Sequence, residues 1–86
     1  MKIWYSRQFK KQYKKFSKKI RRQFRDRLAL FIADQKNSQL HIHKLSGKYD
    51  GLWSMNVSGD VRAVFDCSHR GVAIFVAIGS HSELYS

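Results

Sequence analysis

The sequence predicts an α+β fold in which an amino-terminal strand and a helical hairpin pack on one face of a small antiparallel sheet. Two patterns support this class. Apolar residues recur at helical spacing between positions 9 and 32, and β-rich runs separated by turn residues fill the second half. The chain has 86 residues, 43% of them hydrophobic and 14% aromatic. One compact domain, 1–86, is expected, and the composition argues against intrinsic disorder.

A short strand is expected at Ile3–Tyr5, before a long amphipathic region. The apolar positions of that region are Phe9, Tyr13, Phe16, Ile20, Phe24, Leu28, Phe31 and Ile32. Neither Gly nor Pro interrupts this stripe, so it fits either one long helix or two helices that break near Ser17, a residue suited to cap the second. One face of an amphipathic helix must be buried, so we interpret the stripe as core rather than as a binding platform.

Three β-rich runs follow a polar break at 34–38 and a Gly-containing loop at 46–51. These runs are Leu52–Val57, Val61–Phe65 and Val72–Ile78. The connections at 58–60 and 68–71 are short and hairpin-like, so an antiparallel meander is the simplest arrangement. The last run is apolar on both faces, which predicts an interior strand with the helices covering one side.

The charge of the chain is strongly positive and unevenly distributed. Its formal net charge is +11, and twelve of the seventeen Lys and Arg residues lie within Met1–Arg27, where Asp26 is the single acid. Such a field attracts phosphate backbones, acidic protein tails or anionic membrane surfaces, and charge alone does not choose among them. The amino terminus has no apolar signal region, and Val72–Ile78 is too short to span a bilayer. A single Cys67 suits a reducing compartment, so a cytoplasmic protein is expected.

Two histidine segments, one in the middle of the chain and one at its end, carry the candidate chemistry. The candidate site residues are His43, Asp60, Arg62, His81 and Tyr85. RNA is cleaved without a metal when a base takes the proton of a 2'-hydroxyl, a cation stabilises the phosphorane, and an acid protonates the leaving 5'-oxygen. Histidine suits both proton roles. A meander can bring these residues to one end or one face of the sheet.

Each candidate also has an ordinary structural interpretation. Arg62 can point outward or pair with Asp60, and a buried arginine there would need an anionic partner. His43 can brace the turn that follows it, and His81 can bond to the backbone.

Neither a metal nor a cofactor is expected from the sequence. The pair His41 and His43 has no second cluster of ligands at suitable spacing, and Cys67 and His69 stand alone in a turn. Cys67 has no evident activating partner as a nucleophile. His41 and His69 are expected on the surface.

Four motifs, in this order, resemble a known family. They follow a basic helical hairpin and read His43-Lys-Leu45-Ser-Gly47, Gly51-Leu-Trp53-Ser, Gly59-Asp60-Val-Arg62 and Ile78-Gly-Ser-His81-Ser-Glu-Leu84-Tyr85. Over nearly its whole length the chain resembles toxins of the RelE/ParE superfamily from bacterial type II toxin-antitoxin modules, most closely the YafQ-like branch. The resemblance implies a RelE-like fold and an endoribonuclease that cleaves mRNA, usually on the ribosome, and so inhibits translation. It also implies an acidic antitoxin as partner.

The resemblance implies roles for five residues. His43 and His81 would exchange protons with the 2'-hydroxyl and the leaving oxygen, in an order that the sequence does not assign. Arg62 resembles the strand arginine of the RelE-like branch and would neutralise the phosphorane. Asp60 would orient a histidine or act as base. Tyr85 would stack on a base or donate a hydrogen bond.

The chain departs from the YafQ-like pattern at two positions. Asn56 stands where that branch is expected to carry another catalytic histidine, and Val61 replaces an aromatic residue. The lysines expected to hold messenger or ribosomal phosphates are Lys10, Lys11, Lys14, Lys15, Lys18, Lys44 and Lys48. Two alternatives stay open: a ParE-like toxin that poisons DNA gyrase, and a non-catalytic relative that binds RNA or antitoxin.

Overall fold

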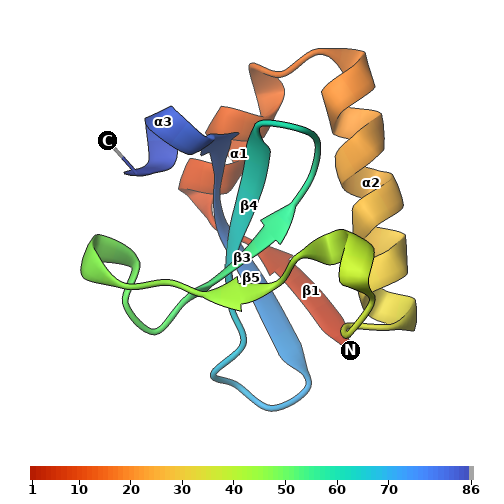
Figure 1. Ribbon diagram of the computed structural model, residues 1–86, viewed down its shortest axis with the longest axis vertical. Helices are drawn as coiled ribbons and strands as arrows, with labels where there is room; N and C mark the ends of the chain where they lie inside the picture. Colours follow the sequence, from red (N-terminus) through yellow and green to blue (C-terminus); the bar gives the residue numbers. More distant parts are fainter. Residues whose placement is uncertain (86) are drawn as a thin grey trace.

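The computed structural model describes residues 1–85 and contains one five-stranded sheet (Figure 1). The elements in chain order are β1 (Lys2–Tyr5), α1 (Arg7–Lys14), α2 (Lys18–Ala33), the 3-10 turn η1 (Ser38–Leu40), β2 (His43–Lys44), the 3-10 turn η2 (Gly47–Tyr49), β3 (Trp53–Asn56), β4 (Val61–Asp66), β5 (Val72–Ser80) and α3 (His81–Tyr85). The strand order is β1-β5-β4-β3-β2, with β1 parallel to β5 and the other pairs antiparallel. The predicted α+β class and the antiparallel meander are confirmed. The amino-terminal strand joins the sheet in parallel, at its edge.

The amphipathic region forms two helices rather than one. Ser17 is the N-cap of α2, where its hydroxyl accepts a hydrogen bond from the backbone N–H of Ile20 at 3.3 Å. Ser6 caps α1 in the same way, accepting from Phe9 N–H at 3.0 Å, and its hydroxyl donates to the carbonyl of Val76 in β5. Side-chain caps therefore start both helices where the sequence has neither Gly nor Pro.

Aromatic rings form the core between the two long helices and the sheet. Each of five phenylalanines is at most 2% exposed, and these are Phe9, Phe24, Phe31, Phe65 and Phe75. The ring centroids of Phe24 and Phe75 lie 5.4 Å apart with nearly perpendicular planes. The interpretation of the helical stripe as core is confirmed at Phe9, Phe24 and Phe31. Ile32 is 50% exposed instead, because consecutive helical residues point about 100° apart and Phe31 takes the inward direction.

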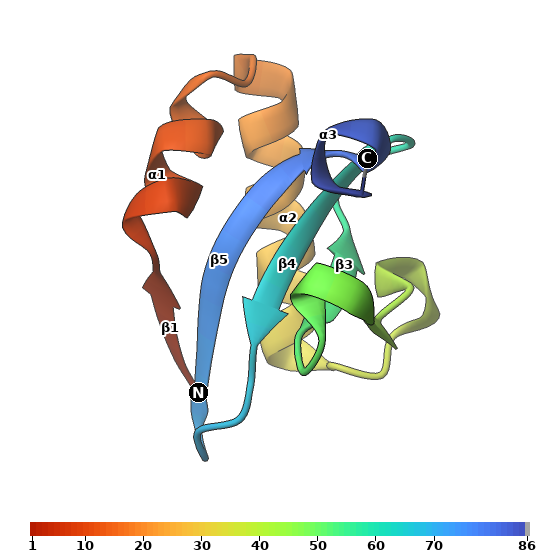
Figure 2. The same ribbon diagram turned by 90° about the vertical axis from the view of Figure 1, so that its left-hand side faces the viewer.

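Helix α3 packs on the opposite face of the sheet from α1 and α2 (Figure 2). Its Leu84 is 1% exposed and forms a second apolar cluster with Val64 and Ala77. The expectation that helices cover one face thus holds for α1 and α2 but not for α3. Neither α3 nor β2 was predicted, because elements of five and two residues carry no periodic signal. Within residues 1–85, no helix is long and apolar enough to cross a membrane.

Candidate active site

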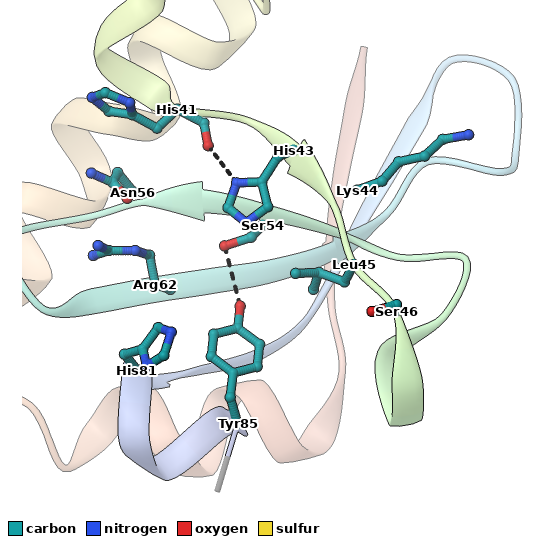
Figure 3. A pocket seen from close by; sticks show the side chains of 10 residues that line it. All are labelled: His41, His43, Lys44, Leu45, Ser46, Ser54, Asn56, Arg62, His81 and Tyr85. Atoms are coloured by element: carbon teal, nitrogen blue, oxygen red, sulfur yellow. Dashed lines mark hydrogen bonds between the residues drawn. The ribbon is translucent and has the colours of Figure 1, made fainter.

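Four of the five candidate residues line one open cavity of about 680 Å³, called the site cavity below (Figure 3). Its lining residues are His41, His43, Lys44, Leu45, Ser46, Ser54, Asn56, Arg62, His81 and Tyr85. Along β3 and β4, cavity-facing residues such as Ser54 and Arg62 alternate with Met55 and Ala63, which belong to the aromatic core cluster. Since successive side chains of a strand point to opposite faces, the site cavity and the aromatic core lie on opposite sides of the sheet.

The short strand β2 places His43 at the rim of the site cavity, opposite Ser54 of β3. His43 Nδ1 lies 3.0 Å from the backbone carbonyl oxygen of His41. A carbonyl oxygen only accepts hydrogen bonds, so this contact assigns the proton of neutral His43 to Nδ1. The lone pair then lies on Nε2, which makes that nitrogen a proton acceptor for a bound molecule.

Arg62 is half-buried in β4 and is anchored by its own hairpin. Its Nη1 donates to the carbonyls of Ser58 at 2.9 Å, Gly59 at 3.2 Å and Val61 at 3.1 Å. These partners are neutral, so they fix the guanidinium without cancelling its charge. None of the three bonds uses Nη2 or Nε, which are the remaining donors of the side chain.

Asp60 is the candidate that the structure does not bring into the site cavity. It lies exposed in the turn between β3 and β4, and it is absent from the cavity lining. Its backbone carbonyl accepts a hydrogen bond from His81 N–H at 3.0 Å. Asp60 thus ties the first residue of α3 to the hairpin turn through its main chain.

Helix α3 presents His81 and Tyr85 to the site cavity (Figure 3). Their rings meet edge to face, with centroids 4.8 Å apart and planes at 64°. The Tyr85 hydroxyl donates to Ser54 Oγ at 3.3 Å, and Ser54 is fully buried. The two α3 side chains are therefore held by each other and by the buried serine of β3.

A reciprocal pair of hydrogen bonds starts α3. Ser80 Oγ accepts from Glu83 N–H at 3.2 Å, and Glu83 Oε1 accepts from Ser80 N–H at 2.7 Å. The Ser80 backbone N–H lowers the pKa of the Glu83 carboxyl, and the Ser80 hydroxyl and the nearby charge of Lys15 lower it further. Gly79 lies so close that a Cβ there would approach Glu83 Oε1 to 3.3 Å. A glycine at this position lets the helix begin directly after β5.

The seven candidate phosphate-binding lysines are dispersed over the molecule. Lys44 lines the site cavity, and its Nζ lies 5.6 Å from the ring centroid of Trp53. Lys10 and Lys14 border a separate, mainly apolar cavity of about 360 Å³ formed by β1, α1 and α2. The other four, all exposed, are Lys11, Lys15, Lys18 and Lys48.

Sequence reasoning missed His41 and Ser54 as residues of the site cavity. His41 has φ 46°, in the left-handed region, where it is the one residue other than glycine with positive φ in the described part of the chain. No sequence signal predicts that conformation, whereas strand alternation would find Ser54 once the cavity face is known. Asn56, where the resemblance implies a histidine, does reach the site cavity. Among residues 1–85, no three or more His, Cys, Asp and Glu side chains are grouped to hold a metal ion.

The fold of this chain is similar to those of several solved toxin structures. The crystal structure of YafQ from E. coli matches with a TM-score of 0.81 and 20% identity, covering 98% of this chain and 97% of that chain. A YoeB/ParE toxin from Agrobacterium tumefaciens matches with a TM-score of 0.77 and 16% identity, covering 94% of this chain and 99% of that chain. The RelB-RelE antitoxin-toxin complex from Methanococcus jannaschii matches with a TM-score of 0.74 and 18% identity, covering 95% of this chain and 94% of that chain. At these identities the likeness establishes the fold.

The family follows from the sequence itself. The profile of the family described as bacterial toxin of type II toxin-antitoxin system, YafQ, matches residues 1–86. The chain therefore belongs to the YafQ family of type II toxins, and the predicted family is confirmed. A comparison with curated protein sequences finds no match.

Proposed function

We propose that this toxin is a metal-independent endoribonuclease that cleaves mRNA, on the ribosome, and thereby inhibits translation. One observation carries the proposal: two imidazoles, a guanidinium and a phenol from β2, β4 and α3 converge on one cavity. Phosphodiester cleavage requires a proton acceptor, a proton donor and a fixed positive charge. The described side chains supply all three.

The chemistry assigns a role to each group. His43 Nε2 takes the proton of the 2'-hydroxyl, and the 2'-oxygen forms a bond to phosphorus. The bond from phosphorus to the 5'-oxygen breaks, and protonated His81 gives its proton to that oxygen. The products are a 2',3'-cyclic phosphate and a free 5'-hydroxyl. The bond from His43 Nδ1 to His41 supports the role of His43 as base, because it leaves Nε2 as the acceptor.

The remaining residues bind the RNA or position His81. Arg62 stabilises the negative charge of the phosphorane through donors that its carbonyl anchors leave unused. Tyr85 holds the His81 ring by edge contact, and Asp60 holds the His81 backbone through its carbonyl. Lys44 binds an adjacent phosphate of the messenger, and the dispersed lysines contact ribosomal RNA.

We further infer an acidic antitoxin that neutralises this toxin. A net charge of +11 favours a partner of opposite charge, because complementary fields speed and orient association. The RelB-RelE structure is a complex of an antitoxin with a toxin of the same fold. An acidic segment laid over the site cavity would compete with RNA for Arg62 and Lys44.

The proposal is tested by mapping new 5' ends on a defined mRNA, incubated with the toxin in solution and on translating ribosomes. His43→Ala, Arg62→Ala and His81→Ala are each expected to lower cleavage by about 100-fold or more. His69→Ala is the matched control, because His69 is exposed in the turn between β4 and β5. Circular dichroism confirms that each variant is folded.

The outcomes separate the proposal from its alternatives. Cuts on ribosomes that vanish in the variants support a ribosome-dependent nuclease, and cuts in both settings support a free nuclease. Losses of threefold or less in all three variants, on the order of 0.7 kcal/mol, would overturn the site assignment. An absence of cuts by the wild type would favour a gyrase-directed or purely binding toxin.

A further inference from the structure

A second depression, of about 390 Å³, adjoins the site cavity on the side of α2. The two share His41 and Asn56 as lining residues, so they meet at these side chains. Figure 3 shows these two side chains at the edge of the site cavity away from Lys44. The depression is lined by polar side chains from α2, η1, β3 and the following turn, with one glycine. We call it the flanking groove.

Arg27 supplies the positive charge of the flanking groove. Its Nη1 donates to Gln39 Oε1 at 3.1 Å, which fixes the guanidinium between α2 and η1. The bond occupies the acceptor of the Gln39 amide and leaves its NH₂ group as a donor. Within residues 1–85, no carboxylate lines either the groove or the site cavity. The charge of Arg27 is therefore available to an anion.

His41 stands where the flanking groove and the site cavity meet. Its backbone is held in the left-handed region by the end of η1, where His41 N–H donates to the Ser38 carbonyl at 3.2 Å. Such a conformation is costly for a residue with a side chain and persists where the surroundings impose it. The imidazole of His41 lies beside the amide of Asn56, at the junction (Figure 3). Planar rings of this kind stack on unpaired bases, and amides bond to base edges.

We propose that the flanking groove binds the nucleotide next to the cleaved bond of a single-stranded RNA. Arg27 binds its phosphate, His41 stacks on its base, and the amides of Gln39 and Asn56 contact the base edge. The inference rests on the proposed function, since it extends the RNA from the site cavity. An acidic peptide is less well matched, because it would use the charge of Arg27 and leave the ring and the amides without planar partners.

The test uses RNA that carries a 2'-deoxy substitution at the mapped cut site, so that binding is measured without cleavage. Dissociation constants are compared for a dinucleotide and for versions extended on either side. Extension on one side is expected to tighten binding by wild type about tenfold. Arg27→Met and Gln39→Glu should each remove most of that gain, the second by placing a carboxylate beside Arg27. For Arg27→Met the negative slope of log affinity against log salt concentration should become shallower by about 0.7, because one phosphate contact is lost.

Matched controls separate this effect from a general loss of charge. Arg22→Met and Gln8→Glu make the same chemical changes at exposed positions that do not line the groove, and should keep the gain. Gln39 is exposed, so its variant tests the groove even if Arg27→Met fails to fold. An equal gain in wild type and both groove variants would overturn the inference. So would variants that weaken binding of a poly-glutamate peptide but not of extended RNA, which would assign the groove to an acidic partner. Length-dependent binding without any cleavage of unmodified RNA, either free or on translating ribosomes, would instead refute the nuclease proposal alone.

Discussion

The hydrogen bond between Tyr85 and Ser54 predicts an asymmetry in stability that mutation can measure. Ser54 is fully buried beneath the site cavity, whereas Tyr85 is half-buried and reaches the solvent. Tyr85→Phe leaves the buried serine hydroxyl without this partner. Ser54→Ala leaves a phenol that can still bond to water. We therefore expect Tyr85→Phe to cost more free energy of unfolding than Ser54→Ala.

The size of the difference follows from the burial and the geometry. A buried polar group that loses its partner costs about 1–3 kcal/mol, and an ordinary hydrogen bond contributes about 0.5–1.5 kcal/mol net. The 3.3 Å separation is long for two hydroxyls, which places both losses near the lower ends of these ranges. In a domain of this size, about 1 kcal/mol shifts Tm by about 4–8 °C. Thermal and urea unfolding at pH 7 measure both variants.

The double variant tests whether the two losses arise from the same bond. Tyr85→Phe combined with Ser54→Ala replaces both polar partners with apolar groups, so no hydroxyl of the pair is left buried and unpaired. We expect it to be more stable than the sum of the single losses predicts, by about 0.5–1 kcal/mol. Strictly additive losses, or a larger loss for Ser54→Ala than for Tyr85→Phe, would refute the reasoning.

Two further predictions concern the core and the start of α3. Phe24→Ala removes a ring that is 2% exposed and lies near four other aromatic rings, so we expect a loss of about 3–5 kcal/mol in urea unfolding. The control Ile32→Ala, at a half-exposed position, should cost about 1 kcal/mol or less, and equal losses would contradict the placement of the core. Hydrogen bonds from Ser80 lower the folded-state pKa of Glu83 below its usual 4.5, so its carboxylate stabilises the fold above that pH and stops doing so as the pH falls through the lowered value. The Tm of Glu83→Gln should therefore lie below that of wild type at pH 7 and converge with it well below pH 4.5, and a difference that stays constant with pH would count against the capping pair.

The layers of the fold were predictable because they depend on periodic burial. The spacing of Phe9, Phe24 and Phe31 reports one buried helix face, and the apolar runs of the meander report strands. Periodicity could not decide between one helix and two, since a break of three residues hardly disturbs the stripe. The N-cap at Ser17 separates the two helices, and the sequence can indicate such a cap because it is a local contact made by a particular residue type.

The sequence predicts which residue types form the site, but it does not predict how they are arranged in space. His43, Arg62 and His81 stand out by chemistry and by their order along the chain. Their arrangement depends on contacts between distant residues, such as the bond from Tyr85 to Ser54, 31 positions apart. Such contacts leave no local pattern in the sequence, so sequence reasoning missed both Ser54 as a cavity residue and helix α3.

Alternation along β3 and β4 also explains how the chemistry of such a site can change on a constant fold. Asn56 and Arg62 face the site cavity, while Met55 and Ala63 face the core. A change on the core side leaves a void in tightly packed side chains, which is costly, whereas Asn56 and Arg62 are only partly buried, so a change at either alters a surface that water already reaches. An asparagine at position 56, where the YafQ-like pattern implies a histidine, is therefore tolerated by the fold. Arg62 lies directly opposite Asn56 in the strand register, so under the proposed function a fixed positive charge stands beside position 56.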